Sequence, residues 1–128
     1  MTFPDDLRYT REHEWARQKG RNVVVGITEY AEDQLGDVVY LELPEVGDPV
    51  KMGESFGVVE STKAVSELFA PVSGKVVEVN APLSDAPEAI NEDPYEEGWM
   101  VVIEPSDPAE VESLMDSKAY QAFLEEQE

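Results

Sequence analysis

Short runs of β-branched and aromatic residues recur through the middle of the chain, separated by turns rich in glycine and proline. Runs of this length are typical of strands, and many short strands joined by such turns are typical of a β-sandwich or a flattened barrel. The chain should therefore be mainly β. We expect strands over residues 23–27, 38–43, 55–60, 64–69, 75–80 and 99–104.

Two regions carry helix signals instead. Thr28 can cap a helix over residues 29–35, and Gly36 can end it. Near the C-terminus, residues 107–110 combine a capping aspartate, a proline at the first helical position and a glutamate two residues later. We therefore expect C-terminal helices at about residues 107–126.

The second of these helices should begin at Ser117, a residue type that caps helices. Its apolar face would bury Tyr120, Phe123 and Leu124. No change of composition marks a domain boundary, so we expect one domain over residues 1–128, with the C-terminal helices packed on the β core.

The net charge of −20 comes from twenty-nine acidic and nine basic residues. A nucleic-acid groove needs a basic surface, and anionic membranes would repel this chain, so neither partner is expected. Strong self-repulsion favours a monomer, and the acidity favours solubility or steering onto basic partner surfaces. The first residues are acidic and lack the pattern of a signal peptide, so we expect a cytoplasmic protein.

Conventional catalytic motifs are missing from the sequence. It has no cysteine, which excludes disulfides, cysteine nucleophiles and thiolate metal sites. His13 is the sole histidine, so a histidine-based metal cluster is excluded, and we expect a structural role for it. A hydrolase using His13 with a serine and an acid stays formally open, although no nucleophile elbow supports it.

Lys63 lies in the short link between the strands expected over 55–60 and 64–69. A hairpin tip is strongly exposed and rigid, so a lysine there can be presented to a modifying enzyme and carry a tethered cofactor. The local pattern by itself favours the alternative, an ordinary solvated lysine.

A set of motifs spread over nearly the whole chain resembles the glycine cleavage system H-protein family. Each motif is weak alone, and their order and spacing are specific. They are His13-Glu14-Trp15, Gly26-Ile27-Thr28, Leu35-Gly36-Asp37-Val38-Val39, Val59-Glu60-Ser61-Thr62-Lys63-Ala64, Pro71-Val72-Ser73-Gly74, Pro94-Tyr95 and Gly98-Trp99-Met100.

This resemblance implies a lipoyl/biotinyl-type β-sandwich, also called a barrel-sandwich hybrid, with short helices and a C-terminal helical segment. It implies lipoate in amide linkage on Lys63, and a carrier rather than an enzyme. The cargo would be the aminomethyl group of decarboxylated glycine. It would pass from glycine decarboxylase (P protein) to aminomethyltransferase (T protein), and dihydrolipoamide dehydrogenase (L protein) would reoxidise the arm.

The resemblance also implies residues that lipoyl-attaching enzymes recognise, which match Glu60, Gly47 and Gly74. It further implies a cleft that shelters the loaded arm, lined near Glu12, Glu14, Gln34 and Glu67. Some family members have serine in place of Glu12 and histidine in place of Gln34. We expect Glu12 to add a third anion near the cationic amine of the cargo.

Two related functions share the same lysine. One is a relay that passes lipoate on to other proteins, and the other is a biotinyl carrier. Biotin carriers typically place methionines on both sides of the modified lysine, whereas Thr62 and Ala64 flank Lys63 here. Lipoate is therefore the favoured group.

Overall fold

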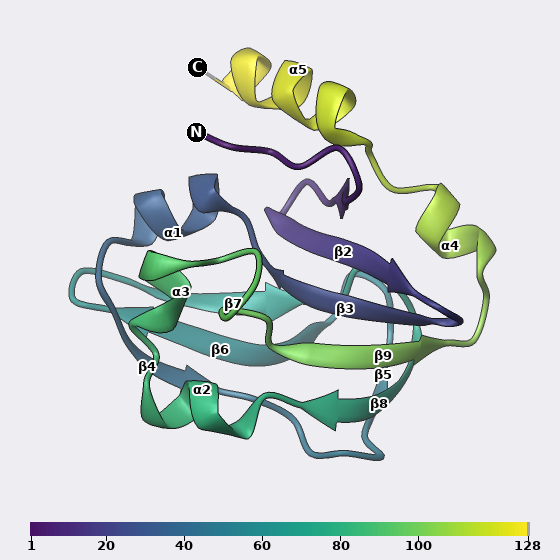
Figure 1. The fold of residues 1–128 in the computed structure, drawn as a ribbon, viewed down its shortest axis with the longest axis horizontal. Helices are drawn as coiled ribbons and strands as arrows, with labels where there is room; N and C mark the ends of the chain where they lie inside the picture. The colour runs from purple at the N-terminus through teal and green to yellow at the C-terminus, as the bar shows by residue number, and fades with distance from the viewer. Residues whose placement is uncertain (128) are drawn as a thin grey trace.

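Two antiparallel sheets enclose the core, and helices close their ends (Figure 1). The structure, a computed structural model, describes residues 1–127. The larger sheet has the order β1-β2-β3-β9-β8-β5: β1 Arg8–Tyr9, β2 Glu14–Lys19, β3 Asn22–Ile27, β9 Val101–Pro105, β8 Gly74–Val79 and β5 Pro49–Val50. The smaller has the order β4-β6-β7: β4 Val38–Glu42, β6 Ser55–Ser61 and β7 Val65–Phe69.

The predicted mainly β fold is confirmed, and each of the six predicted strands is present within two residues of its predicted bounds. The sequence pattern missed the short strands β1 and β5 and two short helices. The helices of the fold are α1 Glu29–Leu35, α2 Ala81–Asp85, α3 Ala89–Glu92, α4 Ala109–Glu112 and α5 Ser117–Gln127.

The main core lies between the two sheets because their strands alternate apolar residues inward. Val25 and Ile103 from the larger sheet and Val59 and Leu68 from the smaller sheet are almost completely buried in one apolar cluster. Burial of this kind is the principal stabilising contribution to such a fold. The hairpin of β6 and β7 is therefore anchored in the core at its base, and its tip projects beyond the core.

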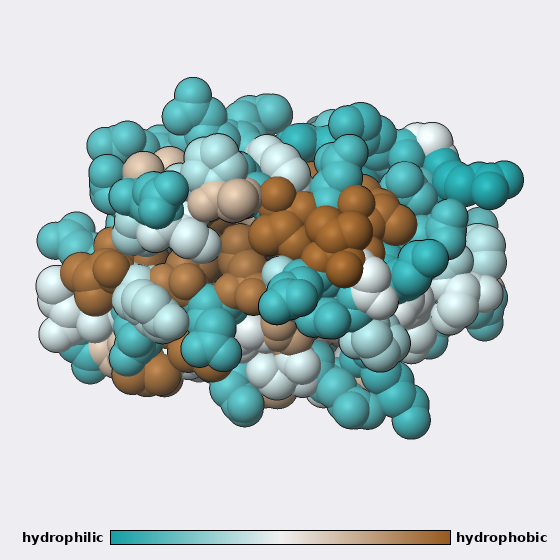
Figure 2. Space-filling model, turned by 90° about the horizontal axis from the view of Figure 1, so that it is seen from below, coloured by the Kyte–Doolittle hydropathy of each residue, from teal (hydrophilic) through white to brown (hydrophobic). Residues whose placement is uncertain are grey.

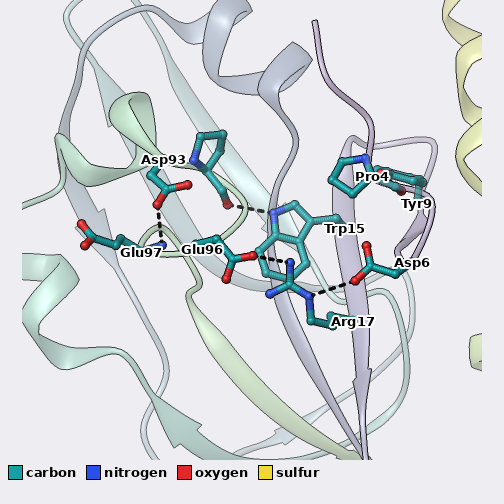
Figure 3. Close-up of polar contacts among 9 residues, drawn as sticks. Pro4, Asp6, Tyr9, Trp15, Arg17, Asp93, Glu96 and Glu97 are labelled. Carbon is teal, nitrogen blue, oxygen red and sulfur yellow. Dashed lines mark hydrogen bonds and ion pairs between the residues drawn. The ribbon is translucent and has the colours of Figure 1, made fainter.

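Trp15 on β2 lies directly on Gly26, its partner on β3. A Cβ atom on Gly26 would lie 2.6 Å from the indole ring, so no larger residue fits there. The indole nitrogen of Trp15 donates to the carbonyl of Pro94 over 3.0 Å, and Figure 3 shows the Trp15 side chain. It also shows Arg17, whose guanidinium lies 5.1 Å from the centre of the Trp15 ring and contacts Glu96. These contacts join the loop after α3 to the outer face of the larger sheet.

Helix α5 covers the N-terminal segment, as Figure 1 shows. The predicted burial of Tyr120 and Leu124 is confirmed. The prediction that Ser117 caps this helix is wrong. Asp116 is the cap, because its carboxylate accepts from the backbone nitrogen of Ala119 over 2.8 Å. The Ser117 hydroxyl instead donates a hydrogen bond to the carbonyl of Phe3 over 2.7 Å.

One face of the molecule carries apolar side chains at its surface. Figure 2 views the molecule from below, and a band of apolar side chains crosses that face between polar ones. Among residues 1–127, no helix combines the length and apolar character needed to cross a membrane.

Candidate functional site

Lys63 sits at the tip of the hairpin formed by β6 and β7, as the sequence predicts. The turn over residues 61–64 is tight, since the Ser61 nitrogen donates to the Ala64 carbonyl over 2.8 Å. The Ser61 hydroxyl oxygen also accepts from the backbone nitrogens of Lys63 at 3.2 Å and Ala64 at 3.0 Å. The backbone of the tip is thus fixed by its own hydrogen bonds, while the Lys63 side chain is exposed.

The hairpin tip is joined to the end of α1. The Thr62 nitrogen donates to the Asp37 carbonyl over 3.0 Å. The Lys63 side chain runs over Gly36, where a Cβ would lie 3.4 Å from Cε of the lysine. Gly36 has φ 80° and ψ −155°, a conformation that is essentially restricted to glycine. As predicted, Thr28 and Gly36 bound this helix, and the Thr28 hydroxyl accepts from the Ala31 nitrogen over 3.2 Å.

A cleft of about 290 Å³ opens beside this helix end. Residues 12–14 form one wall, α1 forms another, and β6, β7 and the end of β3 contribute the rest. Gln34 and Leu35 belong to the lining and Gly36 directly follows them, so the end of the Lys63 side chain, which lies over Gly36, is next to the α1 wall of this cleft. The full lining is Glu12, His13, Glu14, Ile27, Tyr30, Ala31, Gln34, Leu35, Val59, Ser66, Glu67 and Leu68. We call this space the arm cleft.

Glu14 is the buried carboxylate of the arm cleft, with 1% of its surface exposed. One carboxylate oxygen accepts from the Thr10 hydroxyl over 2.8 Å, and the other accepts from the Phe69 nitrogen over 3.3 Å. Burial nevertheless dominates and raises the pKa of Glu14 from 4.5 to about 8, and the nearby Glu12 contributes in the same direction. Near neutral pH, this carboxyl is therefore poised to lose its proton when a cation arrives.

The other predicted cleft residues, Glu12, Gln34 and Glu67, also line the arm cleft, and all three are exposed. The structure thus brings together all four residues that the sequence analysis assigned to the cleft. They come from three separate parts of the chain, so the cleft is a product of the fold. Glu14 differs from the other three in its burial, which lets its carboxylate act in a low-dielectric environment.

The three predicted recognition residues do not lie together. Glu60 is on β6 near the tip, where it pairs with Val65 on one side and Tyr40 on the other. Gly74 is the first residue of β8, which follows β7 at the end of the hairpin away from Lys63. Gly47 lies beside β8, where its backbone nitrogen donates to the Val76 carbonyl over 2.8 Å. Gly47 has φ 98°, which favours glycine. Only Glu60 of the three lies close to Lys63.

His13 lies in the wall of the arm cleft with φ 74°, in the left-handed region. Its Nδ1 lies 2.8 Å from the hydroxyl of Tyr120, and burial lowers its pKa. Sequence reasoning missed Thr10 and Tyr120 as partners of cleft residues. Tyr120 follows His13 by more than a hundred residues, so no local pattern could connect them. No cluster of three or more potential metal-ligating side chains occurs within residues 1–127.

Comparisons with known proteins agree with this geometry. The family model described as "Glycine cleavage H-protein" matches residues 7–127. The glycine cleavage system H protein of Anaeromyxobacter sp. strain K is 78% identical over the full length of both chains. That of Myxococcus xanthus is 62% identical, covering 96% of this chain and 95% of its own.

A solved structure has the same architecture. It is the crystal structure of a glycine cleavage system H protein from Mycobacterium marinum, with a TM-score of 0.86 and 44% sequence identity. The match covers 94% of this chain and 97% of that one. On these matches and on the lipoyl-type sandwich with its exposed hairpin lysine, the chain belongs to the glycine cleavage system H-protein family, the lipoyl carriers of that system.

Proposed function

We propose that Lys63 carries the lipoyl group in amide linkage and that the arm folds back into the arm cleft when loaded. The observation that carries this proposal is the position of the Lys63 side chain, whose end lies over Gly36, the residue that directly follows Gln34 and Leu35 of the cleft lining. The amine is exposed on a rigid turn, which suits recognition by a lipoyl-attaching enzyme. Lipoate, once attached, would supply a disulfide in its dithiolane ring, of which one sulfur would take the aminomethyl group while the other becomes a thiol.

The chain's own residues account for the shelter. The cargo ends in a primary amine, a cation near neutral pH, and it would enter a cleft lined by Glu12, Glu14 and Glu67. Glu14 is the strongest candidate partner, because its buried carboxylate is little screened by solvent. Glu12 and Glu67 are exposed, and their contributions are reduced by solvent screening.

The partners follow from this role. We infer that the chain, acting as one domain over residues 1–128, presents the arm in turn to the P protein, the T protein and the L protein. The tether raises the local concentration of the arm at each docked active site. The net charge of −20 supports a monomer and favours docking onto basic surfaces. The chain supplies no catalysis in this scheme, and His13 Nδ1 is occupied by Tyr120 rather than by a serine.

Intact mass after growth with lipoate tests the attachment. Wild type should gain the mass of a lipoyl group, and Lys63→Arg should not. The matched control is Lys51→Arg, since Lys51 is another lysine with a strongly exposed side chain, and this variant should be modified like wild type. A biotinyl mass would identify the alternative carrier, and a wild-type chain that never gains the lipoyl mass contradicts the proposal.

The shelter has its own test. The lipoylated protein is reduced with a phosphine and loaded with formaldehyde and ammonia. Loss of the cargo is then measured as the return of free thiol. The chain has no cysteine, so every thiol in the assay belongs to the arm. Glu14→Gln should lose its cargo roughly tenfold faster than wild type, because a charge-assisted hydrogen bond is removed.

The control is Glu78→Gln, which removes the same charge from an exposed position on β8 outside the arm cleft. It should behave as wild type does. Equal rates of cargo loss for Glu14→Gln and wild type would show that the cleft does not shelter the amine.

A further inference from the structure

One buried hydroxyl connects two walls of the arm cleft. Tyr120 on α5 is completely buried, and its oxygen lies 2.8 Å from His13 Nδ1 and 2.9 Å from the Thr28 hydroxyl oxygen. His13 belongs to the wall formed by residues 12–14. Thr28 caps α1, which forms the second wall. A side chain from the last helix therefore contacts the supports of both walls.

The hydrogen bonds form a directed chain. The Thr28 hydroxyl already accepts from the Ala31 nitrogen, so its own hydrogen is free to be donated to Tyr120. Tyr120 can then donate to His13 Nδ1. This direction uses both hydroxyl hydrogens of Thr28 and Tyr120, which are completely buried. It assigns the neutral His13 tautomer with its hydrogen on Nε2, in keeping with burial, which lowers the pKa of His13.

His13 needs such an anchor. Its φ of 74° is uncommon for a residue with a side chain and costs conformational free energy. The ring is held by Tyr120 at Nδ1 and by Tyr30, whose ring centre lies 4.8 Å away. Glu12 and Glu14 are the neighbours of His13 in the chain, so the backbone conformation held at His13 helps to set how the chain places these two residues.

We propose that Tyr120 is a positioning residue of the arm cleft, which acts through His13 and Thr28 to fix the Glu14 wall relative to α1. The proposal rests on the sheltering function above. It predicts that removal of one hydroxyl, far from Lys63 in sequence, weakens retention of the cargo. The same change should leave attachment of the arm unaltered.

The chain provides a closely matched control. Tyr9 is as deeply buried as Tyr120 and stacks on it, with ring centres 4.7 Å apart and planes 5° apart. The Tyr9 hydroxyl donates to the Pro4 carbonyl over 2.7 Å and contacts neither cleft wall. Tyr120→Phe and Tyr9→Phe each remove one buried hydroxyl from the same ring stack, so their costs to stability should be similar.

The thiol-return assay on the loaded arm separates the two variants. Tyr120→Phe should lose its cargo about fivefold faster than wild type, as expected when a buried hydrogen-bond network is broken. Tyr9→Phe should match wild type. Both variants should gain the full lipoyl mass, and their Tm values should fall by similar amounts.

Two further readouts do not depend on the cargo. Nitrogen NMR of His13 in the unmodified protein should show the Nε2-protonated tautomer, and Tyr120→Phe should shift the Nδ1 resonance while Tyr9→Phe leaves it in place. His13→Asn, which tolerates the left-handed backbone, should accelerate cargo loss as Tyr120→Phe does. The double variant should be no faster than either single variant, because both remove the same link.

The outcomes distinguish the two proposals. If Glu14→Gln is also without effect, the sheltering function itself is wrong. If Glu14→Gln accelerates cargo loss while Tyr120→Phe and Tyr9→Phe remain equal, only the positioning role of Tyr120 is wrong. Additive effects in the double variant would likewise overturn the route through His13.

Discussion

Lys63 runs across Gly36, so the amine at the hairpin tip and the end of α1 form one local unit. The backbone requires a glycine here, because φ 80° with ψ −155° is a conformation that L-residues rarely adopt. A Cβ at this position would lie at ordinary van der Waals distance, 3.4 Å, from Cε of Lys63.

Gly36→Ala should lower the free energy of unfolding by about 1–3 kcal/mol, because alanine is strained in this conformation. Urea unfolding followed by fluorescence measures the change. The comparison is Gly20→Ala in the turn between β2 and β3, which has φ 62° and no atoms near the added Cβ. It should cost less, about 1 kcal/mol. Equal costs at both positions would contradict the assignment of special strain to Gly36.

Gly26→Ala should destabilise the fold by about 2–3 kcal/mol, because the added methyl group overlaps the Trp15 ring and the interior cannot expand freely. Thermal unfolding measures the loss. Trp15→Phe in the Gly26→Ala background should recover part of it, since the smaller ring makes room. If the double variant is instead the sum of two independent losses, the clash is not the cause.

Glu14 should make stability fall as the pH rises. Its pKa in the folded protein is about 8, above the 4.5 of the unfolded chain, so the folded state binds this proton more tightly. Its contribution is complete below pH 4.5 and is lost as the pH rises through 8. The full shift corresponds to roughly 3–5 kcal/mol.

Urea unfolding of wild type and Glu14→Gln across this range measures the effect, with the exposed Glu78→Gln as control. The difference in the free energy of unfolding between wild type and Glu14→Gln should shrink and then reverse as the pH rises. Glu78→Gln should run parallel to wild type. A pH-independent difference for Glu14→Gln would mean that Glu14 titrates as an ordinary surface acid.

Retention of the cargo should have the opposite pH dependence. A cation in the arm cleft favours the ionised carboxylate, so loading should release a proton from Glu14 near neutral pH. The rate of cargo loss in Glu14→Gln divided by that in wild type should rise from about pH 6 to about pH 8.5, as more of the carboxyl ionises. Taking the ratio removes the intrinsic pH dependence of the chemistry. A flat ratio would contradict an ionic contact at Glu14.

Local signals made much of this fold predictable. Thr28 and Gly36 bound a helix because a cap and a glycine stop act over a few residues, and the hairpin that presents Lys63 follows from two β-patterned runs around a short link. Ser117 shows the limit of such signals. Asp116 and Ser117 can both cap, and the Phe3 carbonyl, distant in sequence, engages the Ser117 hydroxyl and leaves Asp116 as the cap.

The site was predictable in part, for the same physical reason. Lys63 and the four cleft residues follow from the resemblance to the family, and the structure places those four side chains around one cleft. The burial of Glu14 was not foreseen, because acids are exposed by default and no local pattern marks the exception. The link from Tyr120 to His13 depends on the packing of the last helix against the first strands.

Because Tyr120 lies in the last helix, the hairpin lysine and the residue that contacts both cleft walls are synthesised at different times. The β6–β7 hairpin with Lys63 emerges from the ribosome well before α5, which holds Tyr120. A chain cut before α5 would still contain the lysine to be modified and yet lack the residue that braces the cleft walls. On the positioning role proposed for Tyr120, such a fragment would take up cargo and lose it faster than the full chain does, so the C-terminal helix would be as much a part of the carrier function as the lysine.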